Sequence, residues 1–203
     1  MKRYILFTVY CLVFTVLAAQ GLSEQQIIEK MVIAAQQIKT VQCSFTQTRH
    51  MKMLSKEMVS GGKMSCQQPD KLRWEYTTPR ATTLILNGTE ARLKKGEAAN
   101  ASHNKFIGEM ARLIMNSVAG KCLADSKTFQ VTAKESPTQY EATLLPLRKD
   151  IKRIYTKLVL HFDLSKATVT EVELYEKGGD RTVIELHDIQ INKPINAEAF
   201  DLR

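Results

Sequence analysis

The chain has 203 residues, of which 44% are hydrophobic and 25% charged, and its formal net charge is +8 at pH 7. This composition excludes a low-complexity disordered chain and fits one domain with its own core. The basic residues are scattered without interleaved aromatic residues, so we expect no nucleic acid among the partners. A moderately basic protein suits an acidic partner or surface instead.

The first twenty residues are typical of a secretory signal peptide. Lys2 and Arg3 precede an apolar run at 4–19, which ends in small residues that offer a cleavage point. The run is short for a transmembrane span, so an uncleaved anchor is the weaker alternative. Cys11 lies inside this run and is not placed like a lipid-attachment cysteine. Removal of the segment lowers the net charge from +8 to +6, since Lys2 and Arg3 leave with it.

Residues 23–40 are predicted to form an amphipathic helix. Ser23 and Gln26 have the spacing of a capping box. Apolar residues then recur at helical intervals, at Ile27, Ile28, Met31, Ala34, Ala35 and Ile38. We expect this helix to cover the rest of the fold with one apolar face.

Alternation with a period of two begins at Val41 and predicts strands. The run 41–53 places Cys43, Phe45, Met51 and Met53 on one face. A second strand covers 57–66, with an interruption at Gly61-Gly62.

The run 71–78 places Leu72, Trp74 and Tyr76 on one face. Pro69 and Pro79 mark its ends, because proline cannot donate to a strand ladder. The run 82–93, which contains Leu84 and Leu86, turns at Asn87-Gly88 as a tight hairpin does.

Three cysteines remain after the leader, and one disulfide is compatible with export. A hairpin turning near Leu54-Ser55 would bring Cys43 and Cys66 opposite each other. Small buried thiols are the alternative, and a bulge at Gly61-Gly62 would shift the pairing.

The second half of the chain returns to helical spacing and then to strands. After a polar connection at 95–104, the run 106–118 carries Phe106, Met110, Leu113, Ile114 and Ser117 along one side, and Gly120 is a helix stop. Five strand-like runs follow, with Leu158, Leu160 and Phe162 sharing one face. We expect one curved antiparallel sheet with an N-terminal helix and a long helix inserted in mid-chain.

Motifs for catalysis, phosphate binding or metal binding are absent from the sequence. The four histidines are scattered, none at metal-ligand spacing, so we expect no catalytic residue, no cofactor and no metal. An esterase with a triad assembled from distant segments remains an alternative. Methionine is prominent instead, with Met51, Met53, Met58 and Met64 on two neighbouring strands. Flexible methionines suit surfaces that accept variable apolar shapes.

The stretches Ser44–Arg49 (SFTQTR) and Gln68–Pro79 (QPDKLRWEYTTP) resemble LolA, the family of periplasmic lipoprotein carriers. The ordered similarity runs from about Val41 to Gly88. It includes a Phe-Thr-Gln strand, a glycine-containing strand, a Pro-to-Pro segment around Trp74, and the Asn-Gly turn.

The resemblance implies an α+β fold, an incomplete antiparallel β-barrel with a helical lid over a hydrophobic cavity, formed by residues 21–203 as a single carrier domain. The expected walls of this acyl-chain cavity are Phe45, Met51, Met53, Met64, Leu72, Trp74, Tyr76, Leu84, Leu86, Phe106, Met110, Ile114, Leu158, Leu160 and Phe162. Many family members hold the lid with an arginine just before the first proline. Gln68 has that place here, so we expect it to be a weaker lid contact.

The resemblance also implies a function. A periplasmic monomer would take lipidated proteins from an inner-membrane ABC transporter complex, shield their acyl chains, and deliver them to an outer-membrane receptor or membrane surface. Carriage of another lipid, or a lipid-sensing regulatory module with the same fold, are the alternatives.

Overall fold

The computed structural model describes residues 21–54, 56–94, 101–163 and 165–202, without the side chains of 94, 101–108 and 110. The predicted signal peptide and most of the predicted polar connection lie outside the described residues. The inserted helix begins at Ala101, before the predicted start.

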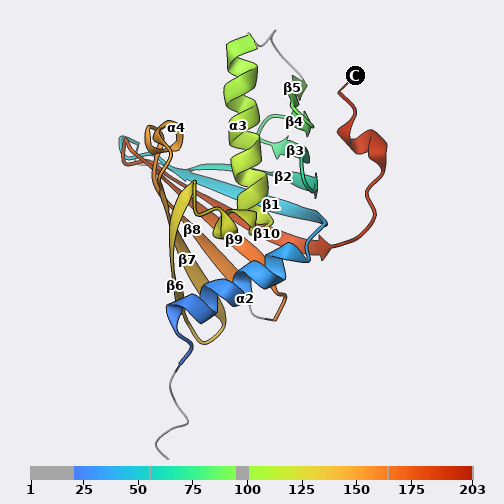
Figure 1. Ribbon diagram of the computed structural model, residues 1–203. Coiled ribbons are helices and arrows are strands. Elements are labelled where there is room, and N and C mark those ends of the chain that lie inside the picture. The colour runs from blue at the N-terminus through green and yellow to red at the C-terminus, as the bar shows by residue number, and fades with distance from the viewer. Residues whose placement is uncertain (1–20, 55, 95–100, 164, 203) are drawn as a thin grey trace, which may run out of the picture.

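One sheet organises the described chain, and helices cover one of its faces (Figure 1). The strand order is β5-β4-β3-β2-β1-β10-β9-β8-β7-β6, so the first and last strands meet in the middle and β5 and β6 form the edges. This confirms the expected α+β fold with an unclosed antiparallel sheet. The elements are α2 (Glu24–Gln36), β1 (Thr40–His50), β2 (Met58–Gln67), β3 (Lys71–Thr78), β4 (Thr82–Asn87), β5 (Glu90–Lys94), α3 (Ala101–Val118), η1 (Lys121–Ala124), β6 (Phe129–Glu135), β7 (Gln139–Pro146), α4 (Lys149–Lys152), β8 (Tyr155–Asp163), β9 (Thr168–Glu176), β10 (Arg181–Ile191) and η2 (Ala197–Phe200).

Helix α2 starts with the predicted capping box. The backbone N–H of Gln26 donates to Ser23 Oγ, and that of Ser23 donates to Gln26 Oε1. The helix ends at Gln36, four residues before the predicted end. Asn192 explains this, because its amide accepts from the Lys39 N–H at 2.7 Å and donates to the carbonyl oxygen of Gln37 at 2.9 Å.

The first hairpin has a different register from the predicted one. Arg49 pairs with Met58, so the turn is centred between Met53 and Leu54, one residue early. Cys43 therefore pairs with Met64, and Cys66 pairs with Val41. The expectation that the two cysteines lie opposite each other is wrong, and both thiols are free and buried. The expected irregularity at Gly61-Gly62 occurs against β3 instead of β1.

The two faces of the sheet differ sharply in polarity. The helix-covered face carries the core, in which Ile27 and Met31 of α2 and Met115 of α3 meet the strand side chains. The segment after β10 returns along the sheet to η2, where Phe200 is fully buried and its carbonyl accepts from Asn87 Nδ2 at 3.2 Å. Sheet and helices thus enclose one apolar interior.

Candidate functional site, an apolar interior covered by helix α3

Most of the predicted wall residues lie on the helix-covered face of the sheet. Tyr76, Leu84 and Ile114 are partly buried against the core. The fully buried members are Phe45, Met64, Leu72, Trp74, Leu86, Leu158, Leu160 and Phe162.

Two predicted wall residues, Met51 and Met53, are not part of the core on that face, and two others fall outside the described side chains. Met53 is 95% exposed and cannot line an interior, because β1 ends at His50 and the alternation of faces stops with it. Met51, one residue beyond the strand, is half-buried. The side chains of Phe106 and Met110 lie outside the described residues.

Three aromatic rings form the centre of the wall. Phe45 and Trp74 stack at 4.1 Å between ring centroids, and Tyr76 meets the Phe45 ring edge-on at 5.4 Å. Gly62 makes this stack fit, because a Cβ there would lie 2.9 Å from Phe45 Cζ and 1.9 Å from the Glu75 carbonyl oxygen. The glycine that interrupts the second strand therefore has a steric reason.

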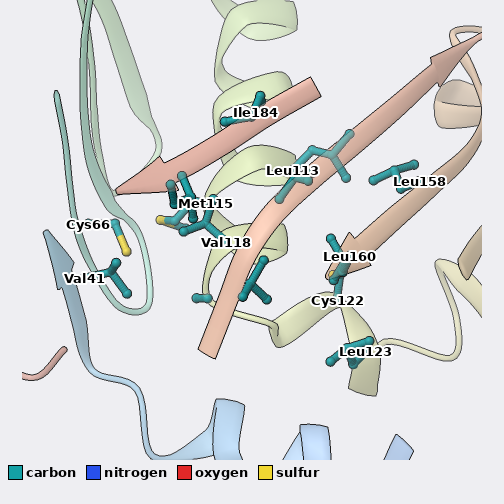
Figure 2. Close-up of a cluster of buried hydrophobic side chains, with 14 of the residues drawn as sticks. Val41, Cys66, Leu113, Met115, Val118, Cys122, Leu123, Leu158, Leu160 and Ile184 are labelled. Atoms are coloured by element: carbon teal, nitrogen blue, oxygen red, sulfur yellow. The ribbon is translucent and has the colours of Figure 1, made fainter. Parts of the chain in front are cut away.

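Helix α3 fills the interior with its own side chains along its second half. Ala111, Met115 and Val118 are buried, and Figure 2 shows Leu113, Met115 and Val118 among strand residues such as Leu158 and Leu160. The apolar cavity expected between helix and sheet is therefore filled by side chains below this part of α3.

A cleft of about 480 Å³ adjoins this closed interior. Its floor is apolar and its rim is charged. Such a volume lies within the range of about 300–1,000 Å³ that is common for small-ligand sites. The lining residues include Arg112, Leu113, Cys122, Phe129, Arg148, Ile151, Arg153 and Ile154, from α3, η1, β6 and the α4 region.

The contact that holds α3 to the sheet differs from the expected one. Gln68 Nε2 is buried and has no hydrogen-bond partner among the described residues. Arg112 makes the connection instead, since its Nη2 donates to the Gly88 carbonyl oxygen at 2.6 Å. The arginine thus sits on the helix, and the acceptor is the β4–β5 turn. Sequence spacing carried no signal for this, because the acceptor is a backbone carbonyl.

The end of α3 has the features of a pivot. Gly120 has φ of 70°, a conformation that favours glycine. A Cβ at this position would lie 2.9 Å from Ala35 Cβ of α2. The chain can therefore reverse tightly against α2, and two small residues, Ala119 and Gly120, connect α3 to η1.

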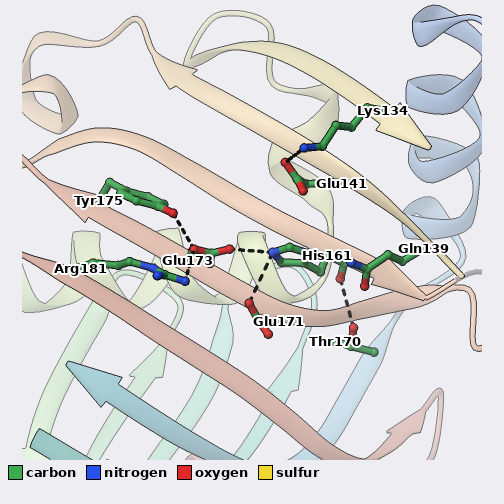
Figure 3. Close-up of polar contacts among 9 residues, drawn as sticks. All are labelled: Lys134, Gln139, Glu141, His161, Thr170, Glu171, Glu173, Tyr175 and Arg181. Carbon is green, nitrogen blue, oxygen red and sulfur yellow. Dashed lines mark hydrogen bonds and ion pairs between the residues drawn. The ribbon is translucent and has the colours of Figure 1, made fainter. Parts of the chain in front are cut away.

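A polar cluster on the opposite face is the described group closest to a metal site. His161, Glu171 and Glu173 bring ligand atoms within 4.8 Å of one another. Figure 3 shows the reason for this arrangement: His161 Nε2 lies 2.7 Å from Glu173, whose other oxygen receives Arg181 at 2.7 Å and the Tyr175 hydroxyl at 2.8 Å.

These contacts form a polar network that joins β8, β9 and β10. Burial raises the pKa of Glu173. The hydrogen bonds with His161 and Tyr175 and the positive charge of Arg181 lower this pKa by a larger amount, so the net shift is downward. Burial also raises the pKa of Glu171. The cluster thus stabilises the sheet on the face opposite the apolar interior. Sequence spacing could not show it, because His161 and Glu171 become neighbours only through strand pairing.

Within the described chain, none of the helices is apolar over a length that would cross a bilayer. The chain is similar to curated bacterial proteins named outer-membrane lipoprotein carrier protein. It is 25% identical to the one from Pseudomonas paraeruginosa over 141 residues, or 70% of this chain and 66% of the relative. It is 19% identical to the one from Pseudomonas putida over 176 residues, or 87% and 82% of the two chains.

Among solved structures, MucB superposes with a TM-score of 0.54 at 10% identity, over 89% of this chain and 62% of MucB. That likeness concerns the fold alone. The family model of the outer membrane lipoprotein carrier protein LolA matches residues 36–203. The aromatic wall, the glycine-dependent stack and the covering helix all fall inside that match, and the chain belongs to the LolA family.

Proposed function

We propose that this protein is a periplasmic carrier that shields the acyl chains of lipoproteins between the inner and outer membranes. The observation that supports it most directly is the single apolar interior, which contains Phe45, Trp74 and Tyr76 and is covered by helix α3. Family membership supports the same role. The supplier would be an inner-membrane ABC transporter complex, and the recipient an outer-membrane receptor or the membrane itself.

The energetics favour an interior that is closed when empty. Exposing the Leu113, Met115 and Val118 side chains on helix opening costs roughly 4.5–9 kcal/mol together, because burial of each contributes about 1.5–3 kcal/mol. An acyl chain of about 16 carbons gains roughly 12 kcal/mol when hidden from water, at about 0.8 kcal/mol per methylene. Binding of the acyl chain can therefore displace helix α3. The free energy that the helix regains on closing in turn favours release of the acyl chain.

Trp74 provides a direct test, because it is the only tryptophan of the chain. A synthetic lipopeptide with brominated acyl chains would be titrated into the protein, since bromine quenches a tryptophan that it touches. We expect saturable quenching of Trp74, and none with the unbrominated lipopeptide.

A second reporter locates the chain within the site. In a Trp74→Phe background, Ile151→Trp places the fluorophore in the cleft near α4. If only the tryptophan at position 151 were quenched, the acyl chain would lie in the cleft. The proposal that it binds against Phe45, Trp74 and Tyr76 would then be refuted. Absence of binding by calorimetry would refute the carrier role, and preference for a plain phospholipid over the lipopeptide would identify another lipid as cargo.

A further inference from the structure

Three loops meet at one end of the sheet, which we call the basic end. They are the β1–β2 hairpin tip (51–54 and 56–59), the segment around α4 (145–154) and the β9–β10 turn (177–180) (Figure 1). Two bonds hold them together: the Lys52 N–H donates to Asp180 Oδ1 at 3.1 Å, and the Lys177 N–H donates to the Ile154 carbonyl oxygen at 2.8 Å.

Exposed apolar side chains concentrate at this end. Met53 is 95% exposed, and Leu54, Met58 and Val59 of the same hairpin are all more than half exposed. Leu145 and Leu147 at the α4 segment are exposed as well. Of the large exposed hydrophobic residues in the described chain, only Ile33 on α2 lies elsewhere. Such a concentration marks a surface that contacts something apolar.

Positive charge surrounds these side chains. The acidic groups of the three loops are already engaged: Asp150 with Arg148, Glu57 with His50, and Asp180 with Arg49. Among the described residues, no ion pair occupies the exposed cations Lys52, Lys56, Lys149, Lys152, Arg153 and Lys177.

The cleft beside α3 lies at the same end. Arg148, Ile151, Arg153 and Ile154 of the α4 segment line it, next to Leu113 of the covering helix. The strands whose ends carry these loops are consecutive neighbours in the order β2, β1, β10, β9, β8 and β7. At a spacing of about 4.8 Å between neighbouring strands, these six strands span roughly 24 Å, so the loops form a broad surface and not a single protruding loop.

We propose that the basic end docks on a bilayer surface rich in anionic phospholipid headgroups. Met53 and Leu54 enter the boundary between headgroups and acyl chains, and the unpaired lysines contact the phosphates. Interfacial binding combines these two terms, apolar insertion and attraction of Lys and Arg to anionic lipid. The proposal extends the carrier function above, because it places the cleft and the covering helix next to the membrane.

Vesicle flotation tests the proposal with the exported chain. Phosphatidylglycerol-phosphatidylethanolamine vesicles are compared with phosphatidylcholine vesicles at low and high salt. We expect at least tenfold stronger binding to the anionic vesicles, with a loss of that preference at high salt. The double variants Met53→Ser, Leu54→Ser and Lys52→Glu, Lys56→Glu should each reduce binding at least tenfold.

Helix α2 offers a matched control. Lys30→Glu with Ile33→Ser removes the same kinds of exposed side chain outside the basic end and should leave binding unchanged. Equal binding by the hairpin variants, or no vesicle binding at all, would overturn the proposal. So would a dimer that Met53→Ser, Leu54→Ser abolishes, since the patch would then pair two copies of the chain. Quenching of Trp74 by the brominated lipopeptide is measured in parallel, so failure here is separable from failure of the carrier function.

Discussion

Replacement of Arg112 by alanine should increase the apparent affinity for acyl chains. The arginine donates a 2.6 Å hydrogen bond from α3 to the Gly88 carbonyl, and a hydrogen bond to a charged group contributes about 1.5–3 kcal/mol. Its loss would shift the balance between closed and open helix about 10- to 100-fold toward the open state, at about 1.4 kcal/mol per factor of ten. When the closed state dominates, the apparent Kd falls by the same factor.

The assay is the brominated-lipopeptide titration, combined with hydrogen exchange of the α3 amides. Arg112→Ala should bind at least tenfold more tightly and exchange faster along α3. Arg92→Ala, an exposed arginine on β5, is the control and should behave like the unmodified protein. Weaker or unchanged binding, together with unaltered hydrogen exchange, would show that Arg112 does not keep α3 closed over the interior. The proposal that α3 opens to admit acyl chains would then fail.

Further expectations concern stability and thiol chemistry. Gly62→Ala should destabilise the fold by about 3 kcal/mol or more in urea unfolding, because the new Cβ meets backbone, whereas Gly178→Ala has open space and should change stability by less than about 1 kcal/mol. Because the net pKa shift of Glu173 is downward from 4.5, its stabilising contribution is full above that value and is lost as the pH falls through the lowered pKa. Glu173→Gln should therefore flatten the acid side of a stability-pH curve measured by thermal unfolding, and an unchanged slope would contradict the role given to the network. Burial raises the pKa of Cys43 to about 12 and of Cys66 to about 11. All three described cysteines should resist iodoacetamide at pH 8 in the folded protein and react after unfolding, and failure to label Cys43 and Cys66 in unfolded, unreduced protein would indicate a disulfide.

Much of the framework could be predicted because its signals are local. The capping box at Ser23, the prolines around the Trp74 strand and the turn at Asn87-Gly88 each depend on neighbours within a few residues. Gly88 has the positive φ that such a turn requires. Alternation of faces likewise placed most of the wall, since side chains in a strand point to opposite sides with a period of two.

The remaining features depend on contacts between distant segments. The first strand ends at His50 while its apolar alternation continues to Met53, so pattern alone assigned an exposed residue to the interior. The Arg112 contact joins a helix to a backbone carbonyl, which no residue type identifies. The short helix α4 lies between two predicted strand runs, in a connection for which no helix was predicted. Its residues form part of the cleft because the end of β7 and the start of β8 lie near α3.

The meeting of β1 and β10 in the middle of the sheet has a consequence for biogenesis. Val41 pairs with Ile191, so the central ladder joins residues 150 positions apart along the chain. A polypeptide that emerges amino-terminus first leaves one side of β1 unsatisfied until nearly all of it has appeared. Because such a long loop must close before its contacts stabilise anything, folding is delayed and slow. The pairs formed by consecutive strands from β1 to β5 can form first, so the topology leaves the central β1–β10 ladder until last.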